Sequence, residues 1–351
     1  MMTSSLMQGF LQKIATGATL EERESELAFE TLMSGTATTA QISAFLMALR
    51  VRGETVAEIT GAARALRSLA FSLVVPSEAI DICGTGGDAK GTYNISTAAA
   101  LIIAGCGVPV AKHGNRAVSS RSGSADVLEA LGVKIDADPI LMIETIAKAQ
   151  ICFMMATRYH DAMRHVMPAR KALGIRTIFN LLGPLSNPAG VRRQVVGVYS
   201  AEWVRPMAEV LGRLGATRVW VVHGRDGLDE ISTTGMTDIA EYCNGTVRTF
   251  TITPDSAGLA KALPGDLQGK ENAAGNAEAI RALLNGTPGP FRDIALLNAA
   301  AGLIVAGAAS NLKDGVAQAT AAVDDGRAQA ALETLVTITN RRQEKGAIRI
   351  A

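Results

Sequence analysis

The 351-residue chain carries 34 Lys and Arg against 33 Asp and Glu, a formal net charge of +1. This balance disfavours a nucleic-acid or membrane-surface partner that is recognised through bulk charge. No apolar run reaches membrane-spanning length, and the four cysteines are too widely spaced to indicate a zinc site or a disulfide framework. We therefore expect a cytoplasmic protein with reduced thiols.

The first 70 residues predict helices and no strand. Capping-box patterns at their expected starts pair Thr19 with Glu22, Thr38 with Gln41 and Thr55 with Glu58. An apolar helix face follows i, i+3, i+4, i+7 spacing at Ile42, Phe45, Leu46 and Leu49. This face needs a partner, either the rest of the chain or a second subunit. We expect residues 1–72 to form a small helical domain, joined by about 168–188, and residues 73–351 to form a larger domain.

Short apolar runs alternate with helical patterns after residue 78, which predicts a parallel or mixed sheet with helices on both faces, hence an α/β domain. The expected strands are Ala79–Cys83, Val108–Ala111, Ile151–Ala156, Gln194–Tyr199 and Val219–His223. Ligands bind at the carboxyl ends of such strands. From Ala274 the chain is helical, Ala-rich and chemically quiet.

A glycine-rich stretch, residues 81–88, follows the first expected strand and contains Gly84-Thr-Gly-Gly-Asp88. Its amides form an anion-binding turn, and a helix beginning near Ser96 adds its N-terminal amides. Asn94, Ser96 and Thr97 offer side-chain donors or caps at that helix end. The spacing matches neither a dinucleotide fingerprint nor a Walker loop, and an ordinary strand-to-helix turn remains an alternative.

A second stretch, residues 112–126, combines three cations with four serine hydroxyls. Lys112 and Arg116 suit paired phosphate oxygens. A solvated surface loop remains the alternative, and His113 also suits a satisfied buried position. Together the two stretches predict a site for a phosphate ester.

Asp229 and Glu230 follow the strand ending at His223, in a glycine-containing loop where both carboxylates can converge on one hard cation such as Mg²⁺. An ordinary acidic turn is the alternative. A basic run over 158–176 suits an acidic small molecule, nucleic acid or no ligand at all. Within that run, Arg170 is the candidate clamp for a substrate carboxylate, because a guanidinium pairs a carboxylate bidentately.

The ordered set of motifs resembles the anthranilate phosphoribosyltransferase family over roughly Thr19 to Ala240. The motifs are Asp81-x-x-Gly-Thr-Gly-Gly-Asp88, Asn94-Ile-Ser-Thr97, Lys112-His-Gly-Asn-Arg116, Ser122-Gly-Ser-Ala-Asp126, Arg170-Lys-x-Leu-Gly-Ile-Arg-Thr-Ile-Phe-Asn180, Gly183-Pro-Leu-x-Asn-Pro188 and Asp229-Glu230. The resemblance implies a homodimer through the N-terminal helices and a nucleoside-phosphorylase-like phosphoribosyltransferase fold, a small helical domain plus a larger α/β domain. It implies transfer of the phosphoribosyl group of 5-phosphoribosyl 1-diphosphate to anthranilate, in tryptophan biosynthesis.

The resemblance also implies roles for individual residues. The phosphoribosyl diphosphate would be bound by Gly84, Gly87, Asp88, Thr92, Asn94, Ile95, Ser96, Thr97, Lys112, His113, Gly114, Asn115, Arg116, Ala117, Val118, Ser119, Ser120 and Ser124. Anthranilate would meet Gly84, Asn115 and Arg170. Two Mg²⁺ ions would be held by Ser96, Asp229 and Glu230.

The chain departs from the family pattern at two places. Met155-Ala-Thr-Arg-Tyr159-His160-Asp161-Ala-Met163 stands where the family often has Phe-Ala-Pro-x-His-His-Pro-Ala-Met, in the loop that faces the acceptor. Arg121 stands where a lysine is common. The expected chemistry needs positioning of a neutral amine more than its deprotonation, so no residue is expected to be an indispensable base. The alternative functions are a pyrimidine-nucleoside phosphorylase and a nucleic-acid-binding paralogue of the same fold.

Overall fold

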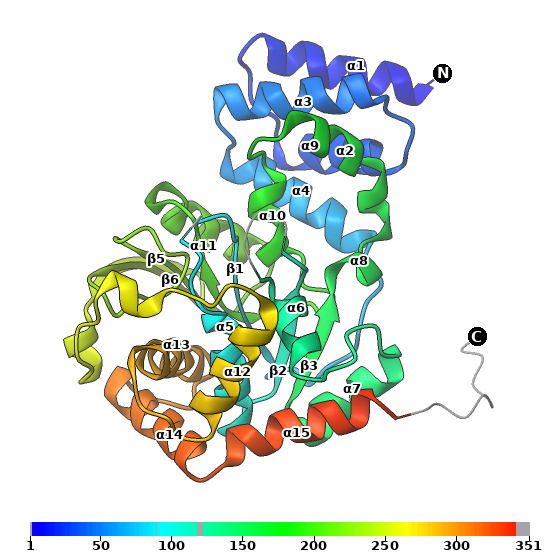
Figure 1. Cartoon of the computed structure of the whole chain (residues 1–351). Coiled ribbons are helices and arrows are strands. Elements are labelled where there is room, and N and C mark those ends of the chain that lie inside the picture. Colours follow the sequence, from blue (N-terminus) through cyan, green and yellow to red (C-terminus); the bar gives the residue numbers. More distant parts are fainter. Residues whose placement is uncertain (1, 89, 118–121, 342–351) are drawn as a thin grey trace.

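A computed structural model gives the structure over residues 2–88, 90–117 and 122–341, with side chains from Leu6 onward. Figure 1 shows a helical domain at one end of the molecule and a larger α/β domain at the other. The first domain contains α1 (Met2–Ala15), α2 (Glu22–Met33), α3 (Thr39–Arg52) and α4 (Val56–Ser68). None of the helices in the described ranges is both long enough and apolar enough to span a bilayer.

Two of the three predicted capping boxes are confirmed, and the first is wrong. Thr38 and Thr55 cap α3 and α4, with Gln41 and Glu58 as their reciprocal partners. Helix α2 instead starts after Glu21, whose N–H donates to Glu24 Oε2 at 2.8 Å. The reason lies in the buried Glu58, which accepts a hydrogen bond from the amide of Leu20 at 2.9 Å. Leu20 and Thr19 therefore lie in the connection that precedes α2 and not in its first turn.

The segment after residue 155 returns to the helical domain. It contains α8 (Ala156–Tyr159), a 3₁₀ turn (Asp161–His165), α9 (Met167–Leu173) and α10 (Phe179–Leu185). Helix α9 packs on α3, and α10 packs on α4 (Figure 1). Phe179 completes an edge-to-face cluster in which Phe29 lies 5.7 Å from Phe45 and 5.6 Å from Phe179 between ring centroids. The helical domain therefore buries side chains from two distant parts of the sequence.

A seven-stranded mixed sheet forms the centre of the larger domain, in the order β3-β2-β1-β4-β5-β6-β7. The first five strands are parallel and confirm the predicted positions: β1 (Ile80–Gly84), β2 (Val110–Gly114), β3 (Ile151–Met155), β4 (Arg193–Gly197) and β5 (Arg218–Gly224). The helices α5 (Ile95–Gly105), α6 (Ser124–Ala130), α7 (Pro139–Ala149) and α11 (Val204–Arg213) lie between them in sequence. Because all five strands are parallel, their carboxyl ends meet at one edge.

An antiparallel hairpin, β6 (Thr237–Cys243) and β7 (Thr246–Ile252), extends the sheet beyond β5. Its two-residue turn, Asn244-Gly245, has positive φ at both positions, 46° and 91°. Asn-Gly is a strong sequence signal for such a turn. The sequence prediction stopped at the fifth strand and missed it.

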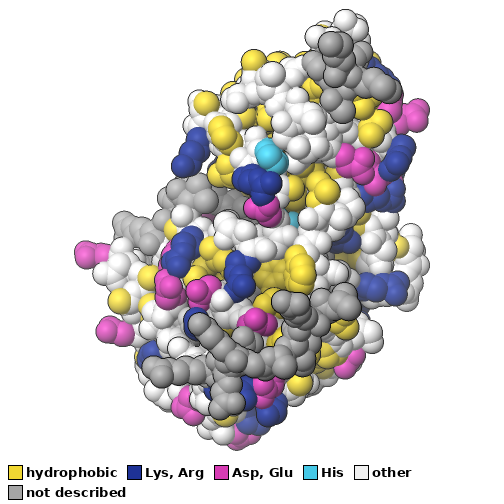
Figure 2. Space-filling model, turned by 90° about the vertical axis from the view of Figure 1, so that its right-hand side faces the viewer, with side chains coloured by type: hydrophobic (Ala, Val, Ile, Leu, Met, Phe, Trp, Pro, Cys, Tyr) yellow, Lys and Arg dark blue, Asp and Glu magenta, His cyan; other side chains and the backbone are white. Residues whose placement is uncertain are grey.

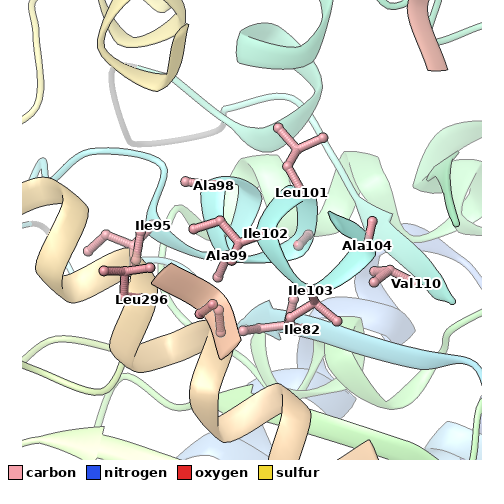
Figure 3. Close-up of a cluster of buried hydrophobic side chains, with 14 of the residues drawn as sticks. Ile82, Ile95, Ala98, Ala99, Leu101, Ile102, Ile103, Ala104, Val110 and Leu296 are labelled. Carbon is pink, nitrogen blue, oxygen red and sulfur yellow. The ribbon is translucent and has the colours of Figure 1, made fainter. Parts of the chain in front are cut away.

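Opposite faces of the sheet bury different sets of neighbours. Ile82, Val195 and Trp220 pack into a cluster with α5 and the C-terminal helices. Figure 3 shows Ile82 beneath α5, Val110 near Ala104 at one end of the helix and Leu296 near Ile95 at the other. The alternate residues Val196 and Val221 face the other way and join the cluster of the helical domain. The C-terminal helices are α12 (Ala273–Leu284), α13 (Pro290–Ala306), α14 (Leu312–Asp324) and α15 (Arg327–Thr339). The helical domain is thus anchored through a core that continues onto the sheet.

Candidate active site

A cavity of about 1040 Å³ lies between the carboxyl ends of the parallel strands and the helical domain. It is lined by the predicted residues Gly84, Gly87, Asp88, Thr92, Asn94, Ile95, Ser96, Thr97, Lys112, His113, Gly114, Asn115, Arg116, Ala117, Ser124, Arg170, Asp229 and Glu230. Val118, Ser119, Ser120 and Arg121 lie outside the described residues. The fold therefore brings every described candidate to one cavity, at the position where open α/β sheets bind ligands.

Two glycines allow the Asp229–Glu230 loop to approach the sheet. Gly84 and Gly197 are direct neighbours across β1 and β4. A Cβ on Gly197 would lie 1.5 Å from the carbonyl oxygen of Asp229, and one on Gly84 would lie 2.3 Å from Asp229 Oδ2. A side chain at Gly197 would overlap the backbone of the loop, and one at Gly84 would displace the Asp229 carboxylate. The amide of Gly86 then donates to Asp229 Oδ2 at 2.7 Å.

Glu230 meets the start of α5, which follows the same glycine-rich stretch. Ser96 N, one of the first amides of α5, donates to Glu230 Oε1 at 3.2 Å. The predicted anion-binding turn and helix start thus each direct one amide, that of Gly86 and that of Ser96, at a protein carboxylate in this structure. Helix N-termini attract negative charge of either kind.

The carboxylates at this edge repel one another. Burial raises the pKa of Asp229, and the nearby Asp88 raises it further. Burial likewise raises the pKa of Glu230, with Asp229 adding to the shift and Lys112 opposing it. A cation would relieve this repulsion.

The residues present fit a hard cation such as Mg²⁺, because carboxylate and hydroxyl oxygens are its preferred protein ligands. Asp229 and Glu230 supply carboxylates, and Ser96 supplies a hydroxyl beside them. Among the described residues no group of three or more His, Cys, Asp or Glu side chains forms a metal site by itself. A cation here would therefore take further ligands from water or from the phosphates of a substrate, as Mg²⁺ does.

Lys112 is buried at the base of the cavity, with 1% of its surface exposed. Its Nζ donates to Ile82 O at 2.6 Å and to Ser96 Oγ at 3.4 Å. The buried Asp81 on the adjacent strand accepts from His113 N at 3.4 Å. Burial raises the pKa of Asp81, and the charge of Lys112 opposes that shift. Lys112 thus places a fixed positive charge below the helix N-terminus.

Arg116 behaves differently from Lys112. Its guanidinium donates to Asp126 at 3.0 Å and to Glu129 at 2.8 and 3.1 Å, and these partners raise its pKa. Asp126 also accepts from the amides of Ala117 and Gly123. In this structure protein carboxylates hold Arg116, and Asp126 binds backbone amides as well.

Arg170 is one of the cations that line the opposite, more apolar half of the cavity, together with Arg164 and Lys171. Its guanidinium carbon lies 5.2 Å from the centroid of the Phe179 ring. It forms no salt bridge with any described residue, and burial lowers its pKa. Met163 and Pro168 line the cavity beside it. A partly desolvated guanidinium over an aromatic ring suits a flat carboxylate ligand.

Two histidines lie between the halves. The rings of His113 and His160 meet edge to face, 5.3 Å apart. Burial, and secondarily the neighbouring His160, lowers the pKa of His113 to about 3. Burial also lowers the pKa of His160. Both rings are therefore neutral near pH 7.

Two family models match the chain: the helical bundle domain of a glycosyl transferase family over residues 8–70, and its α/β domain over residues 76–329. Anthranilate phosphoribosyltransferase of Rhodospirillum rubrum is 60% identical, covering 96% of both chains. That of Azospirillum brasilense is 58% identical, over 95% of this chain and 93% of the relative. The chain belongs to the anthranilate phosphoribosyltransferase family.

Solved structures of anthranilate phosphoribosyltransferases are similar to this chain over nearly their whole length. Anthranilate phosphoribosyltransferase from Thermus thermophilus superposes with a TM-score of 0.90 at 45% identity, covering 95% of this chain and 99% of that one. The Saccharomyces cerevisiae enzyme in complex with PRPP and Mg gives a TM-score of 0.88 at 27% identity, covering 95% and 98%. The same yeast enzyme has been solved in complex with 4-fluoroanthranilate. The predicted fold class is confirmed.

The departures from the family motif have visible consequences in this member. Asp161, which replaces a common proline, lines the cavity and pairs with Arg164. Tyr159 is buried and packs 6.1 Å from Phe71. An exposed charge pair therefore stands at this part of the cavity, where the family often has a proline.

The sequence analysis assigned no role to three residues that bear on the site. Arg176, named only within the basic run, donates to Gly87 O and stacks 4.4 Å from the centroid of Tyr199. Asn298 on α13 bonds the amide and carbonyl of Ile231, directly after Glu230, at 3.0 and 2.8 Å. Asn276 on α12 bonds Asn94. Only Arg176 lies in a recognisable motif, whereas both asparagines lie in the helical region predicted to be quiet.

Proposed function

We propose that the chain transfers the phosphoribosyl group of 5-phosphoribosyl 1-diphosphate to the amine of anthranilate, giving N-(5-phosphoribosyl)anthranilate and diphosphate, a step of tryptophan biosynthesis. One observation carries the proposal: a single cavity unites both glycine-rich loops, two buried carboxylates and Arg170 over an aromatic ring. Family membership at up to 60% identity supports the same reaction.

The donor binds at the strand ends. Backbone amides from Gly84 to Asp88 and at the start of α5 would take its phosphate oxygens, with Thr92, Asn94 and Thr97 beside them. Residues 112–120 and Ser124 would cover its other side. Lys112 is held beneath Ser96 by a hydrogen bond, so it provides positive charge without the entropy cost of immobilising an exposed side chain.

Asp229, Glu230 and the Ser96 hydroxyl would hold two Mg²⁺ ions on the diphosphate. When bound, Mg²⁺ stabilises the negative charge that develops on the leaving diphosphate. The yeast relative contains Mg. Gly84 and Gly197 keep Asp229 against the sheet, so the carboxylates are positioned before the donor arrives.

Arg170 orients the acceptor by pairing with its carboxylate, while Phe179 and Met163 contact the ring. Asn115 and Gly84 would meet the acceptor where it faces the donor. Diphosphate leaves through a transition state with oxocarbenium character, and the neutral amine then needs only to be placed near the reacting carbon. At a pKa of about 3, His113 is a poor proton acceptor at pH 7, which supports a reaction without an indispensable base.

The chain is proposed to be a homodimer that associates through its N-terminal helices. Leu6 on α1 and Val51 on α3 are 37% and 80% exposed, which gives this end of the domain apolar surface to bury. A cytoplasmic location is also proposed, because the four cysteines are free thiols. Light scattering of the purified protein tests the dimer, and a monomer mass would contradict it.

The central test measures diphosphate release from the phosphoribosyl donor and anthranilate, with and without Mg²⁺. We expect turnover only when donor, acceptor and metal are all present. Asp229→Asn should raise the Mg²⁺ concentration needed for half-maximal rate by about tenfold or more. An unchanged Mg²⁺ titration would refute the metal role of Asp229.

The alternatives are tested alongside. A pyrimidine-nucleoside phosphorylase would cleave thymidine with inorganic phosphate, and we expect no such cleavage. A nucleic-acid-binding paralogue would need a continuous basic surface, whereas Figure 2 shows acidic and basic side chains interspersed on the face it presents. Thymidine phosphorolysis without phosphoribosyl transfer would overturn the proposal.

A further inference from the structure

Asn276 lies in the first turns of α12, at the edge of the cavity half that is proposed to bind the donor. This donor half is lined by described residues of two segments, 84–97 and 112–124, which we call the first and second donor loops. It is 2% exposed. Its Oδ1 accepts from the backbone amide of Lys270 at 2.8 Å, and its Nδ2 donates to Asn94 Oδ1 at 3.0 Å. Both ends of this amide are therefore occupied by protein partners.

Asn94 continues the connection to the second glycine-rich stretch. It occupies the N-cap position of α5, but its side chain makes no capping hydrogen bond. Its Nδ2 donates instead to Ser122 O at 3.1 Å. A chain of hydrogen bonds thus runs from α12 through the first donor loop to the second.

Chemistry fixes the orientation of both amides. The Lys270 amide can only donate, so it must meet Asn276 Oδ1, and Nδ2 must then face Asn94. Asn94 therefore presents its oxygen to Asn276 and its nitrogen to the Ser122 carbonyl, which can only accept. Reversing either amide would place donor against donor or acceptor against acceptor.

The backbone before α12 reinforces this contact. Gly269 N and Gln268 Nε2 both donate to Gly91 O, at 2.9 and 2.7 Å. A Cβ on Gly269 would lie 2.6 Å from Thr92 O, so the two backbones touch. Gln268, Gly269 and Asn276, which we call the C-terminal clasp, therefore hold residues 91–94 at the edge of the cavity.

We propose that Asn276 is a positioning residue for the phosphoribosyl donor, an inference that rests on the proposed function. It acts through Asn94: by donating to Asn94 Oδ1, it keeps Asn94 Nδ2 aimed at Ser122 O and both donor loops in register. Loss of this bond frees the Asn94 side chain to turn toward the amides of α5, its usual role at an N-cap. The donor would then meet two loops that are no longer held together.

The test is a set of matched variants. Asn276→Ala removes both hydrogen bonds, and Asn276→Asp keeps an acceptor for Lys270 N but cannot donate to Asn94. Asn272→Ala is the control, because Asn272 caps the same helix through Gly275 N at 2.9 Å, is exposed and does not contact the donor loops. Initial rates give the KM of each substrate, and calorimetry gives donor affinity with Mg²⁺ and no acceptor.

We expect both Asn276 variants to weaken donor binding and to raise donor KM about tenfold, with less than a twofold change in anthranilate KM. Asn272→Ala should lower the melting temperature but leave donor KM unchanged. In an Asn94→Ala background, Asn276→Ala should raise donor KM by less than a further twofold, because its effect is transmitted through Asn94.

Three results would overturn the inference. The first is donor affinity in Asn276→Ala that is no weaker than in Asn272→Ala, and the second is an equal rise in the KM of both substrates. The third is a rise in donor KM caused by Asn276→Ala that is as large in the Asn94→Ala background as in the parent chain. Asn276→Asp keeps the test open should the alanine variant fail to fold. An inactive parent chain would refute the proposed function instead, while calorimetry of the donor would still decide the role of Asn276.

Discussion

The two halves of the cavity, the proposed donor half at the strand ends and the proposed acceptor half around Arg170, are built in opposite ways. At the strand ends, backbone touches backbone: Gly84 and Gly197 leave no space for a Cβ, and amides hold Asp229 and Glu230. On the acceptor side, short helices present apolar side chains and Arg170, which forms no salt bridge with a described residue. Close contacts between backbone segments fix the geometry of the first half, and the packing of side chains fixes that of the second. Substitutions in the two halves should therefore fail in different ways.

The largest effect is expected from Gly197→Ala. The new methyl group would overlap the carbonyl oxygen of Asp229, so the Asp229–Glu230 loop must move away from the sheet. A displacement of about 1 Å at a catalytic group costs on the order of 100-fold in rate. We expect at least that loss in kcat/KM, accompanied by a raised Mg²⁺ requirement.

Gly235→Ala is the control for this prediction. It lies shortly after Glu230 in the sequence, and a Cβ there would meet nothing within 4 Å. It should keep near-normal activity. If Gly197→Ala kept a normal Mg²⁺ titration, the close contact between Gly197 and Asp229 would not be what positions the carboxylates of the donor half.

Arg170→Ala should affect the other half. Removing a charged hydrogen-bonding partner of the anthranilate carboxylate costs about 1.5–3 kcal/mol, or roughly 10- to 150-fold. We expect this as a rise in the KM of anthranilate, with donor KM changed less than threefold. Lys171→Ala, the adjacent cation that also lines the cavity, should change neither constant by more than a few-fold. Equal effects on both substrates would show that the two halves are not separable.

How far the sequence predicts each half follows from the same contrast. The donor loops are short, local motifs at strand ends, and every described candidate from residues 84–97 and 112–124 lines the cavity. Phe179 contacts Arg170 across the link between α9 and α10, and no local pattern in the sequence reveals that contact. Asn276 and Asn298 are single asparagines in Ala-rich helices, and their partners lie 182 and 67 residues away in sequence. Long-range hydrogen bonds of this kind leave no spacing signal.

Arg176→Ala tests whether the halves communicate. This side chain comes from the link between α9 and α10, yet it donates to Gly87 O in the donor loop and stacks on Tyr199. An exposed contact of this type contributes about 1 kcal/mol, so we expect roughly a fivefold rise in donor KM. Arg176→Lys should recover part of it, because a lysine keeps the charge but loses the planar stacking. No change in donor KM would mean that the halves bind their substrates independently.

The smallest effect on activity is expected from His113, at the boundary between the halves. If no base is required, His113→Ala should keep measurable turnover, with any loss reflected in substrate affinity. Abolished turnover with both affinities intact would overturn that view. The larger consequence should appear in acid stability, because His113 is buried as a neutral ring.

Its pKa is about 3 in the folded protein and about 6.5 when unfolded, so between these values the unfolded chain binds the extra proton. The stability conferred by the neutral ring is complete above pH 6.5 and is lost progressively as the pH falls toward 3. By pH 4 the unfolding free energy should have dropped by about 3 kcal/mol from this group. Urea unfolding from pH 7 to pH 4 should show a steeper loss of stability in the parent chain than in His113→Ala, where His160 and the carboxylates with shifted pKa values still contribute. Parallel slopes would mean that the ring is not held neutral, and the argument against a protonated catalytic group at this boundary would fail with it.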